Sequence, residues 1–299
     1  MNNQAWIIFS ILRAFDLAVV TIIDKYIITK WIDKPILPVV LYGIIGVVPG
    51  ICVFRIHGFH SLTLPHMILA FGAGICFILM AWLYFHAAKI EEISRVVPLF
   101  YLAPFFVAIL ASLSLQEVLP ANKYFGITLL VLGSILISYK KTSKLRSLKP
   151  LWLMILSSLF FSVYSVILKY LIGQSDFWTV FAFMRISVFV AIIPLCTKYL
   201  PHLCKSVRKH GKKVLGFMIL AESLSLAAAL FMIVAISSGS VTLVNSLSSI
   251  QPFFVFIFAL ILSIHYPHII KEDTGLSVLS LKLLAIALMF IGSLFITQP

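Results

Sequence analysis

Long apolar segments, separated by short polar connections, run through the whole chain. A helix that crosses the hydrocarbon core of a bilayer needs about 20 consecutive, mostly apolar residues. Ten segments meet this requirement, and the connections between them reach only about 16 residues, too few for a further folded domain. The pattern therefore predicts an all-α integral membrane protein with ten transmembrane helices, at residues 5–29, 36–54, 65–88, 92–116, 123–139, 150–171, 177–197, 213–236, 240–264 and 278–297.

One stretch of the first half of the chain recurs in the second half. AAKIEEISRVVPLFYLAPFFVAILASLSLQE, residues 87–117, returns 148 residues later as AISSGSVTLVNSLSSIQPFFVFIFALILSIH, which places Pro104 on Pro252. The pair Gly133-Ser134 likewise returns as Gly292-Ser293. The repeat unit is thus five spans long, and because five is odd the second unit enters the membrane with the opposite orientation.

The sequence therefore predicts two inverted five-helix repeats, at 1–139 and 150–299, joined by a basic cytoplasmic linker at 140–149. In secondary transporters this arrangement places the substrate site near the midplane, between the halves, and supports two exchangeable conformations. Prolines inside apolar segments interrupt the helical hydrogen-bond ladder, and lipid offers no water to the carbonyl that is freed. Pro98, Pro104 and Pro252 are accordingly predicted to break or hinge the spans that carry them.

Composition agrees with a membrane protein. The chain is 62% hydrophobic and 11% charged, with a mean hydropathy of +1.11, values that exclude a soluble domain of this length. Its net charge of +13 comes mainly from lysines and arginines in the connections that follow odd-numbered spans, whereas the only basic residues of the termini and the other connections are Arg55 and Lys123. By the positive-inside rule both termini face away from the cytoplasm. The basic runs 140–149 and 205–213 are therefore interpreted as topology signals of a multi-pass cell-membrane protein and not as nucleic-acid sites.

Catalytic and metal-binding motifs are not found. The sequence contains no HExxH and no GxSxG, and its four cysteines have no CxxC spacing. We expect no enzyme activity, no metal and no cofactor.

Four charged residues lie at or within reach of the middle of predicted spans, where charge is costly and often functional. Arg13 and Asp16 lie three residues apart in 5–29, Arg185 lies near the middle of 177–197, and Glu222 lies within 213–236. Two positive and two negative groups can neutralise one another across helices, or they can hold a zwitterionic solute. The residues leave both interpretations open.

Further polar or aromatic candidates lie near span ends. Trp82 and His86 precede the short connection at 89–91, where an aromatic residue can anchor the interface and a histidine can carry a proton. Asn245 and Gln251 belong to a polar stripe at the start of 240–264 and can donate hydrogen bonds to a solute or to a neighbouring helix. Lys25 and Lys169 occupy matching positions and are expected to reach the lipid headgroups.

From these positions we predict a cavity lined by the first, third, fourth, sixth, eighth and ninth spans. The fifth and tenth spans pack outside it through their glycine faces. Asp16, Arg185 and Glu222 are expected to meet the solute, with Arg13 balancing Asp16. A carboxylate there can change its charge between water-facing and occluded states, which allows proton antiport, whereas fixed pairs give facilitated diffusion.

The paired units resemble a known family. The chain resembles EamA-type members of the drug/metabolite transporter superfamily in four features. These are the Ala-x6-Ser/Thr entry to the fourth and ninth spans, the following Pro-Phe-Phe, the closing Glu117 and Glu272, and the glycines of the fifth and tenth spans. Arg185 matches an arginine frequent in the second span of such a unit, whereas the first unit has Tyr42-Gly43 there.

This resemblance implies a ten-helix bundle that exports or exchanges small metabolites, amino acids or toxic compounds. From the inverted repeat we expect such a carrier to work by alternating access. Its expected partners are a small-molecule solute and the lipid bilayer, with protons as an option, and it is expected to be a monomer or a homodimer. The alternative that the resemblance leaves open is a flippase, or flippase subunit, for lipid-linked sugars.

Overall fold

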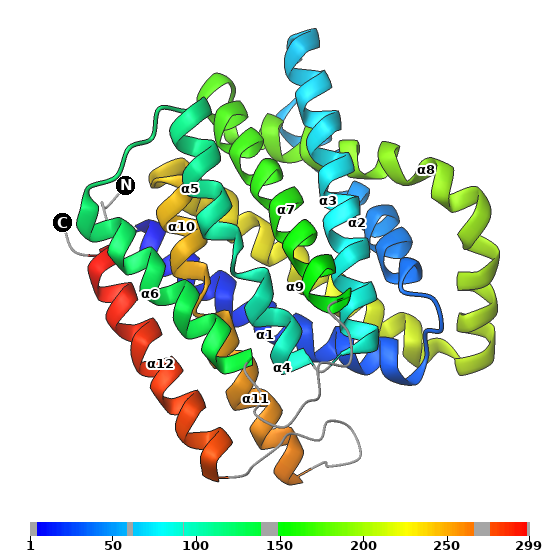
Figure 1. Ribbon diagram of the computed structural model, residues 1–299. Coiled ribbons are helices and arrows are strands. Elements are labelled where there is room, and N and C mark those ends of the chain that lie inside the picture. Colours follow the sequence, from blue (N-terminus) through cyan, green and yellow to red (C-terminus); the bar gives the residue numbers. More distant parts are fainter. Residues whose placement is uncertain (1–4, 59–61, 92, 139–148, 266–275, 298–299) are drawn as a thin grey trace.

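The computed structural model describes residues 5–58, 62–91, 93–138, 149–265 and 276–297. Every regular element in these ranges is a helix (Figure 1). Seven segments of the described chain are long and apolar enough to cross a membrane, and shorter apolar helices accompany them. The chain is therefore a multi-pass membrane protein. The helices are α1 (Ala5–Lys30), α2 (Ile36–His57), α3 (Leu64–Ile90), α4 (Ile93–Phe100), α5 (Ala103–Ser114), α6 (Ala121–Ser138), α7 (Lys149–Gln174), α8 (Phe177–His210), α9 (Lys212–Ser238), α10 (Val241–Ser248), α11 (Gln251–His265) and α12 (Leu276–Thr297).

Two of the predicted spans are each divided into a pair of helices. The segment 92–116 contains α4 and α5, and the segment 240–264 contains α10 and α11. Pro104 lies in the first turn of α5 and Pro252 in the first turn of α11, where a helix does not need the N–H that proline lacks. Each helix thus restarts at its proline. Pro98, in contrast, lies inside α4, which continues to Phe100.

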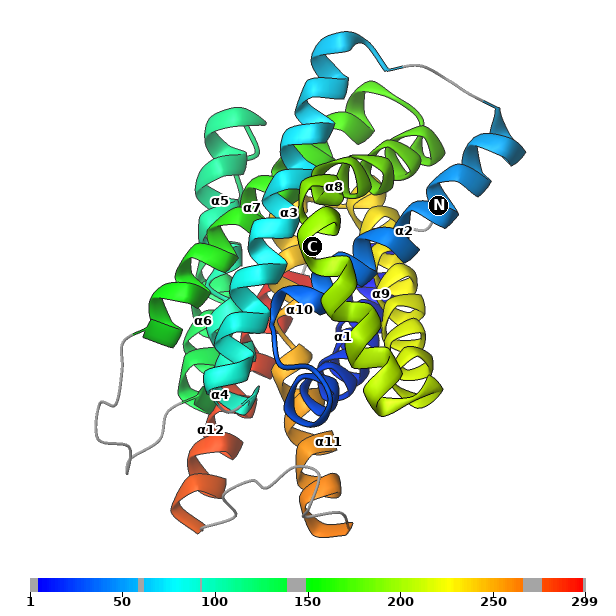
Figure 2. The ribbon, with the colours of Figure 1, turned by 90° about the vertical axis from the view of Figure 1, so that its right-hand side faces the viewer.

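The helix α8 extends well beyond the predicted segment 177–197. It begins behind Asp176, whose side chain accepts hydrogen bonds from the backbone N–H groups of Trp178 and Thr179, and it runs through Pro194 and Pro201 to His210. The hydrophobic pattern does not predict this extension, because the last turns of α8 carry basic residues. Figures 1 and 2 show α8 curving along one side of the bundle.

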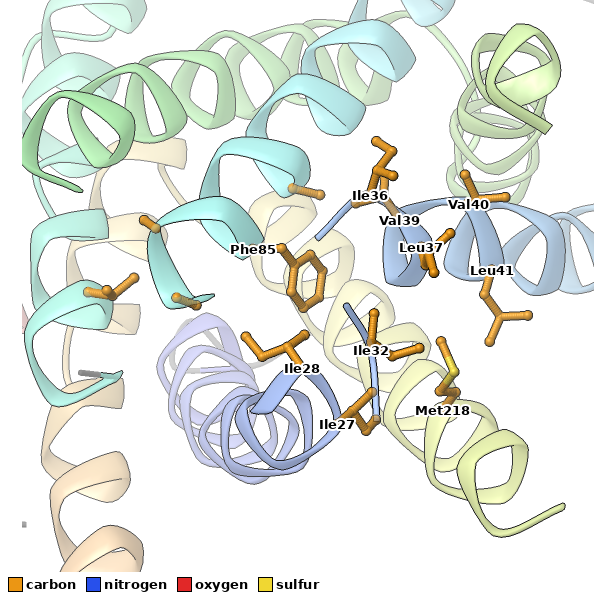
Figure 3. Close-up of a cluster of buried hydrophobic side chains, with 14 of the residues drawn as sticks. Ile27, Ile28, Ile32, Ile36, Leu37, Val39, Val40, Leu41, Phe85 and Met218 are labelled. Carbon is orange, nitrogen blue, oxygen red and sulfur yellow. The ribbon is translucent and has the colours of Figure 1, made fainter. Parts of the chain in front are cut away.

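Helices from the two halves of the chain pack against one another. The helix α1 lies along α9, α2 lies along α8, and α3 lies along α7 and α8. A large apolar core joins α1, α2, α3, α8 and α9 near one end of the bundle. Figure 3 shows Ile28, Ile32, Phe85 and Met218 converging there from α1, the α1–α2 connection, α3 and α9.

A separate helix pair, α6 and α12, lies at the side of the bundle (Figure 1). The two helices cross at Gly126 and Gly292, where a Cβ atom on either glycine would lie 2.7 Å from the carbonyl oxygen of the other. They share a small core of Ile127, Leu130, Ala285, Met289 and Ile296. This close packing requires glycine at the crossing.

Candidate solute cavity

A cavity of about 180 Å³ lies among α1, α2, α3, α4, α7, α8 and α9, with the first residue of α11. Most of its wall is apolar or aromatic, and Phe77, Met80, Phe100, Phe161 and Met232 contribute to it. As predicted, none of the described residues of α6 or α12 lines it. Its polar lining consists of Arg13, Thr21, Asp24, Tyr42, Tyr84, Tyr164, Arg185, Glu222, Ser225 and Gln251.

The helix α1 presents one polar face to the cavity. Thr21 and Asp24 follow Arg13 by 8 and 11 residues, spacings that return to the same side of an α-helix. Because each residue adds about 1.5 Å, Arg13 and Asp24 lie roughly 16 Å apart along the axis. The cavity thus has a cation and a carboxylate at separate levels of α1.

Arg185 and Glu222 form an ion pair across α8 and α9. The Nη1 atom of Arg185 lies 4.0 Å from Oε1 of Glu222, and both side chains are buried. Two glycines of α2 make room for this pair. A Cβ atom on Gly46 would lie 3.2 Å from Oε1 of Glu222, and one on Gly50 would lie 3.1 Å from Cβ of Arg185. Any larger side chain at these glycines would therefore press on the pair.

Two further hydrogen-bonded groups connect α1 to other elements. Tyr42 of α2 donates to Oδ1 of Asp24. The amide of Gln251 donates to Oγ1 of Thr21 at 3.0 Å, and its carbonyl oxygen accepts from the Tyr101 hydroxyl. Tyr101 lies at the break between α4 and α5, and Gln251 begins α11 after the corresponding break. Both breaks are thus linked through one side-chain amide to the cavity face of α1.

Arg13 does not pair with Asp16. Its guanidinium lies 5.6 Å from the ring centroid of Phe161 and interacts electrostatically with Tyr101 and Tyr164. Asp16 is buried outside the cavity lining, and its Oδ2 atom has no hydrogen-bond partner among the described residues. The expected pairing fails because the long arginine side chain reaches the cavity whereas the short aspartate side chain points to another part of the helix surface. The carboxylate that α1 supplies to the cavity is Asp24.

Three other sequence candidates also lie outside the cavity. Trp82 is 41% exposed, and His86 packs against it one helical turn later, with ring centroids 6.2 Å apart. Both belong to a face of α3 that turns away from the cavity, whereas Tyr84 on the same helix lines it. Asn245 is buried, and its amide donates to the Val241 carbonyl within α10. Arg13, Arg185, Glu222 and Gln251 are the sequence candidates that the fold brings together.

The helices α2 and α8 line the cavity in addition to the predicted spans. Tyr42 of α2 and Tyr164 of α7 were missed, because an aromatic residue in an apolar segment resembles a core residue. Asp24 was not predicted as a site residue because it lies near the end of α1. Its spacing of 11 residues from Arg13 is the signal in the sequence that could have found it.

Comparison with known proteins agrees with this architecture. The model of the EamA-like transporter family matches residues 4–139. This match agrees with the resemblance found in the sequence, over the first half of the chain. No curated protein matches the chain. A solved structure titled "Crystal structure of protein" is 19% identical, covers 99% of this chain and 96% of its own, and superposes with a TM-score of 0.66, so the two share a fold.

Proposed function

We propose that this protein is a secondary transporter of small solutes that works by alternating access across the cell membrane. It acts as an exporter or exchanger, with metabolites, amino acids or toxic compounds as cargo. The observation that carries this proposal is the cavity itself. It lies between apolar helices of both halves, yet Arg13, Asp24, Arg185 and Glu222 all line it. Charge at such a position is expensive in a bilayer and typical of a solute pathway.

The architecture behind the proposal is two inverted five-helix repeats, residues 1–139 and 150–299. The divided helices support it, since the α4–α5 and α10–α11 breaks fall 148 residues apart and each precedes a proline. Discontinuous helices next to a central site recur in inverted-repeat transporters. Residues 140–148 of the basic linker lie outside the described residues, and Lys149 begins α7.

Proton coupling is a further part of the proposal. Glu222 and Asp24 are the carboxylates that line the cavity. If either gains and loses a proton during the transport cycle, a pH gradient drives solute movement. If the Arg185–Glu222 pair stays fixed, transport is facilitated diffusion. Uptake by Glu222→Gln and Asp24→Asn proteins, with and without an imposed pH gradient, separates these mechanisms.

Exchange in liposomes tests the proposed function for many solutes at once. Purified protein is reconstituted into vesicles filled with an isotope-labelled metabolite extract and diluted into the unlabelled extract. We expect selected metabolites to exchange, as read by mass spectrometry. Ser225→Trp, which fills the cavity, should abolish exchange, whereas Ser223→Trp, on an exposed side of the same helix, should preserve it. Lipid scrambling without metabolite exchange would contradict the carrier and favour a flippase.

A further inference from the structure

The charged groups of the cavity are unequally matched. Arg185 is paired with Glu222, and Asp24 accepts a hydrogen bond from Tyr42. Arg13 is only 5% exposed, yet among the described residues no carboxylate lies within 4.0 Å of its guanidinium. The cavity therefore contains one buried cation that no described protein anion neutralises by contact.

The neighbours of Arg13 stabilise it only in part. The ring of Phe161 offers a cation–π contact at 5.6 Å, and Tyr101 and Tyr164 add neutral dipoles. The Tyr101 hydroxyl is already engaged with Gln251. A guanidinium carries five N–H donors in a planar fork that matches a carboxylate, and burying it without an anion is costly. An anion inside the cavity would supply the missing contact.

From this arrangement we infer that the cargo is a small organic monoanion whose carboxylate binds Arg13. This inference rests on the proposed transport function and names its substrate class. The apolar body of such a molecule would lie against Phe77, Met80, Phe100 and Phe161, which share the cavity wall with Arg13. A second negative group is disfavoured because Asp24 and Glu222 face the same space. A volume of about 180 Å³ restricts the cargo to a small molecule.

Ligands with one shared body and different head groups test this inference. The melting temperature of the detergent-purified protein is measured with phenylacetate, phenylacetamide and 2-phenylethylamine, whose heads are negative, neutral and positive. Hexanoate and inorganic phosphate complete the panel. Because binding to the folded state raises its stability, the carboxylates should raise the melting temperature at the lowest concentrations and the amine should have no effect.

Variants at Arg13 locate the binding group. Arg13→Gln should weaken phenylacetate binding at least tenfold and leave phenylacetamide binding unchanged. Arg13→Lys keeps the charge but loses the fork, so it should weaken phenylacetate binding less. Arg55→Gln, on an exposed part of α2, is the matched control and should bind as wild type does. If Arg13→Gln does not fold, the Arg13→Lys result decides.

The inference would be overturned by equal binding of phenylacetate and phenylacetamide, by no effect of either carboxylate on wild type, or by undiminished phenylacetate binding by the Arg13 variants. Stabilisation by phosphate alone would also contradict it and assign the site to another anion. Binding in detergent does not require transport. Carboxylate binding without exchange in liposomes would therefore refute the proposed transport function and support the anion site. Exchange of neutral metabolites alone would support the transport function and refute the anion site.

Discussion

Lys25 and Lys169 cap the carboxyl ends of two different helices in the same way. Lys25 of α1 donates to the carbonyl oxygens of Ala88 and Glu91, at 2.8 and 3.0 Å, where α3 ends. Lys169 of α7 donates to those of Ile236 and Gly239, both at 2.8 Å, where α9 ends. Residues 88 and 236, and residues 91 and 239, are each 148 positions apart, the same offset that relates the repeated sequence.

These lysines were expected to reach the lipid headgroups, but they bind backbone within the protein. The last carbonyl groups of a helix lack intrahelical donors and form the negative end of its dipole, so an ammonium there is stabilising. Because α1 contacts the end of α3 and α7 contacts the end of α9, each half of the chain contains one such cap. The correspondence supports the proposed inverted repeat more specifically than shared helix counts could.

Removing either cap should destabilise the protein. Lys25→Met and Lys169→Met each leave two carbonyl oxygens without their donor, and hydrogen bonds from a charged group contribute about 1.5–3 kcal/mol. We expect both to lower the free energy of unfolding by similar amounts in that range, measured as a lower melting temperature in detergent. Lys205→Met, at an exposed position of α8, is the control. A loss no larger than the control's would show that the caps contribute nothing.

Two glycines of α3 should respond differently to alanine. A Cβ atom on Gly74 would lie 2.6 Å from the carbonyl carbon of Ser187 in α8, whereas one on Gly72 would meet no atom within 4 Å. Gly74→Ala must therefore separate two packed helices, at a cost of about 1–3 kcal/mol. Gly72→Ala should leave stability unchanged or raise it by up to about 1 kcal/mol, because alanine favours helix. Equal melting temperatures for the two variants would contradict the packing of α3 on α8.

The cavity was only partly predictable from the sequence, for a physical reason. The repeat, the prolines and the charges within apolar segments can be recognised in the sequence itself. Arg185 and Glu222 were predicted because charge is costly in an apolar segment. The side of a helix that faces the cavity depends on how the helix is rotated about its axis. These helices carry apolar residues on every side, so the hydrophobic pattern does not reveal that rotation. For this reason burial of charge alone does not distinguish Asp24 from Asp16, and only the spacing of 11 residues from Arg13 favours Asp24. Trp82 and Tyr84, which lie two residues apart on different faces of α3, carry no such signal.

Membrane orientation gives a prediction that native and introduced cysteines can test. Cys204 is exposed near the basic end of α8, and Gln174 is exposed at the opposite end, before α8 begins. The charge distribution places Cys204 in the cytoplasm and residue 174 outside. In proteins that retain one cysteine, an impermeant maleimide added to intact cells should label Gln174→Cys and not Cys204. The reverse labelling would invert the topology.

We propose that the cavity opens alternately to the two sides of the membrane, and the accessibility of Ser225 from each side measures this opening. Ser225 lines the cavity from α9, and Ser223 lies two residues earlier on an exposed side of that helix. Each is replaced by cysteine in a protein whose four native cysteines are serine. A charged, impermeant thiol reagent should label Ser225→Cys in right-side-out vesicles and also in inverted vesicles. Because we expect the exposed side of α9 to face lipid, the reagent should label Ser223→Cys in neither. Labelling of Ser225→Cys from one side only, under every solute condition, would contradict alternating access.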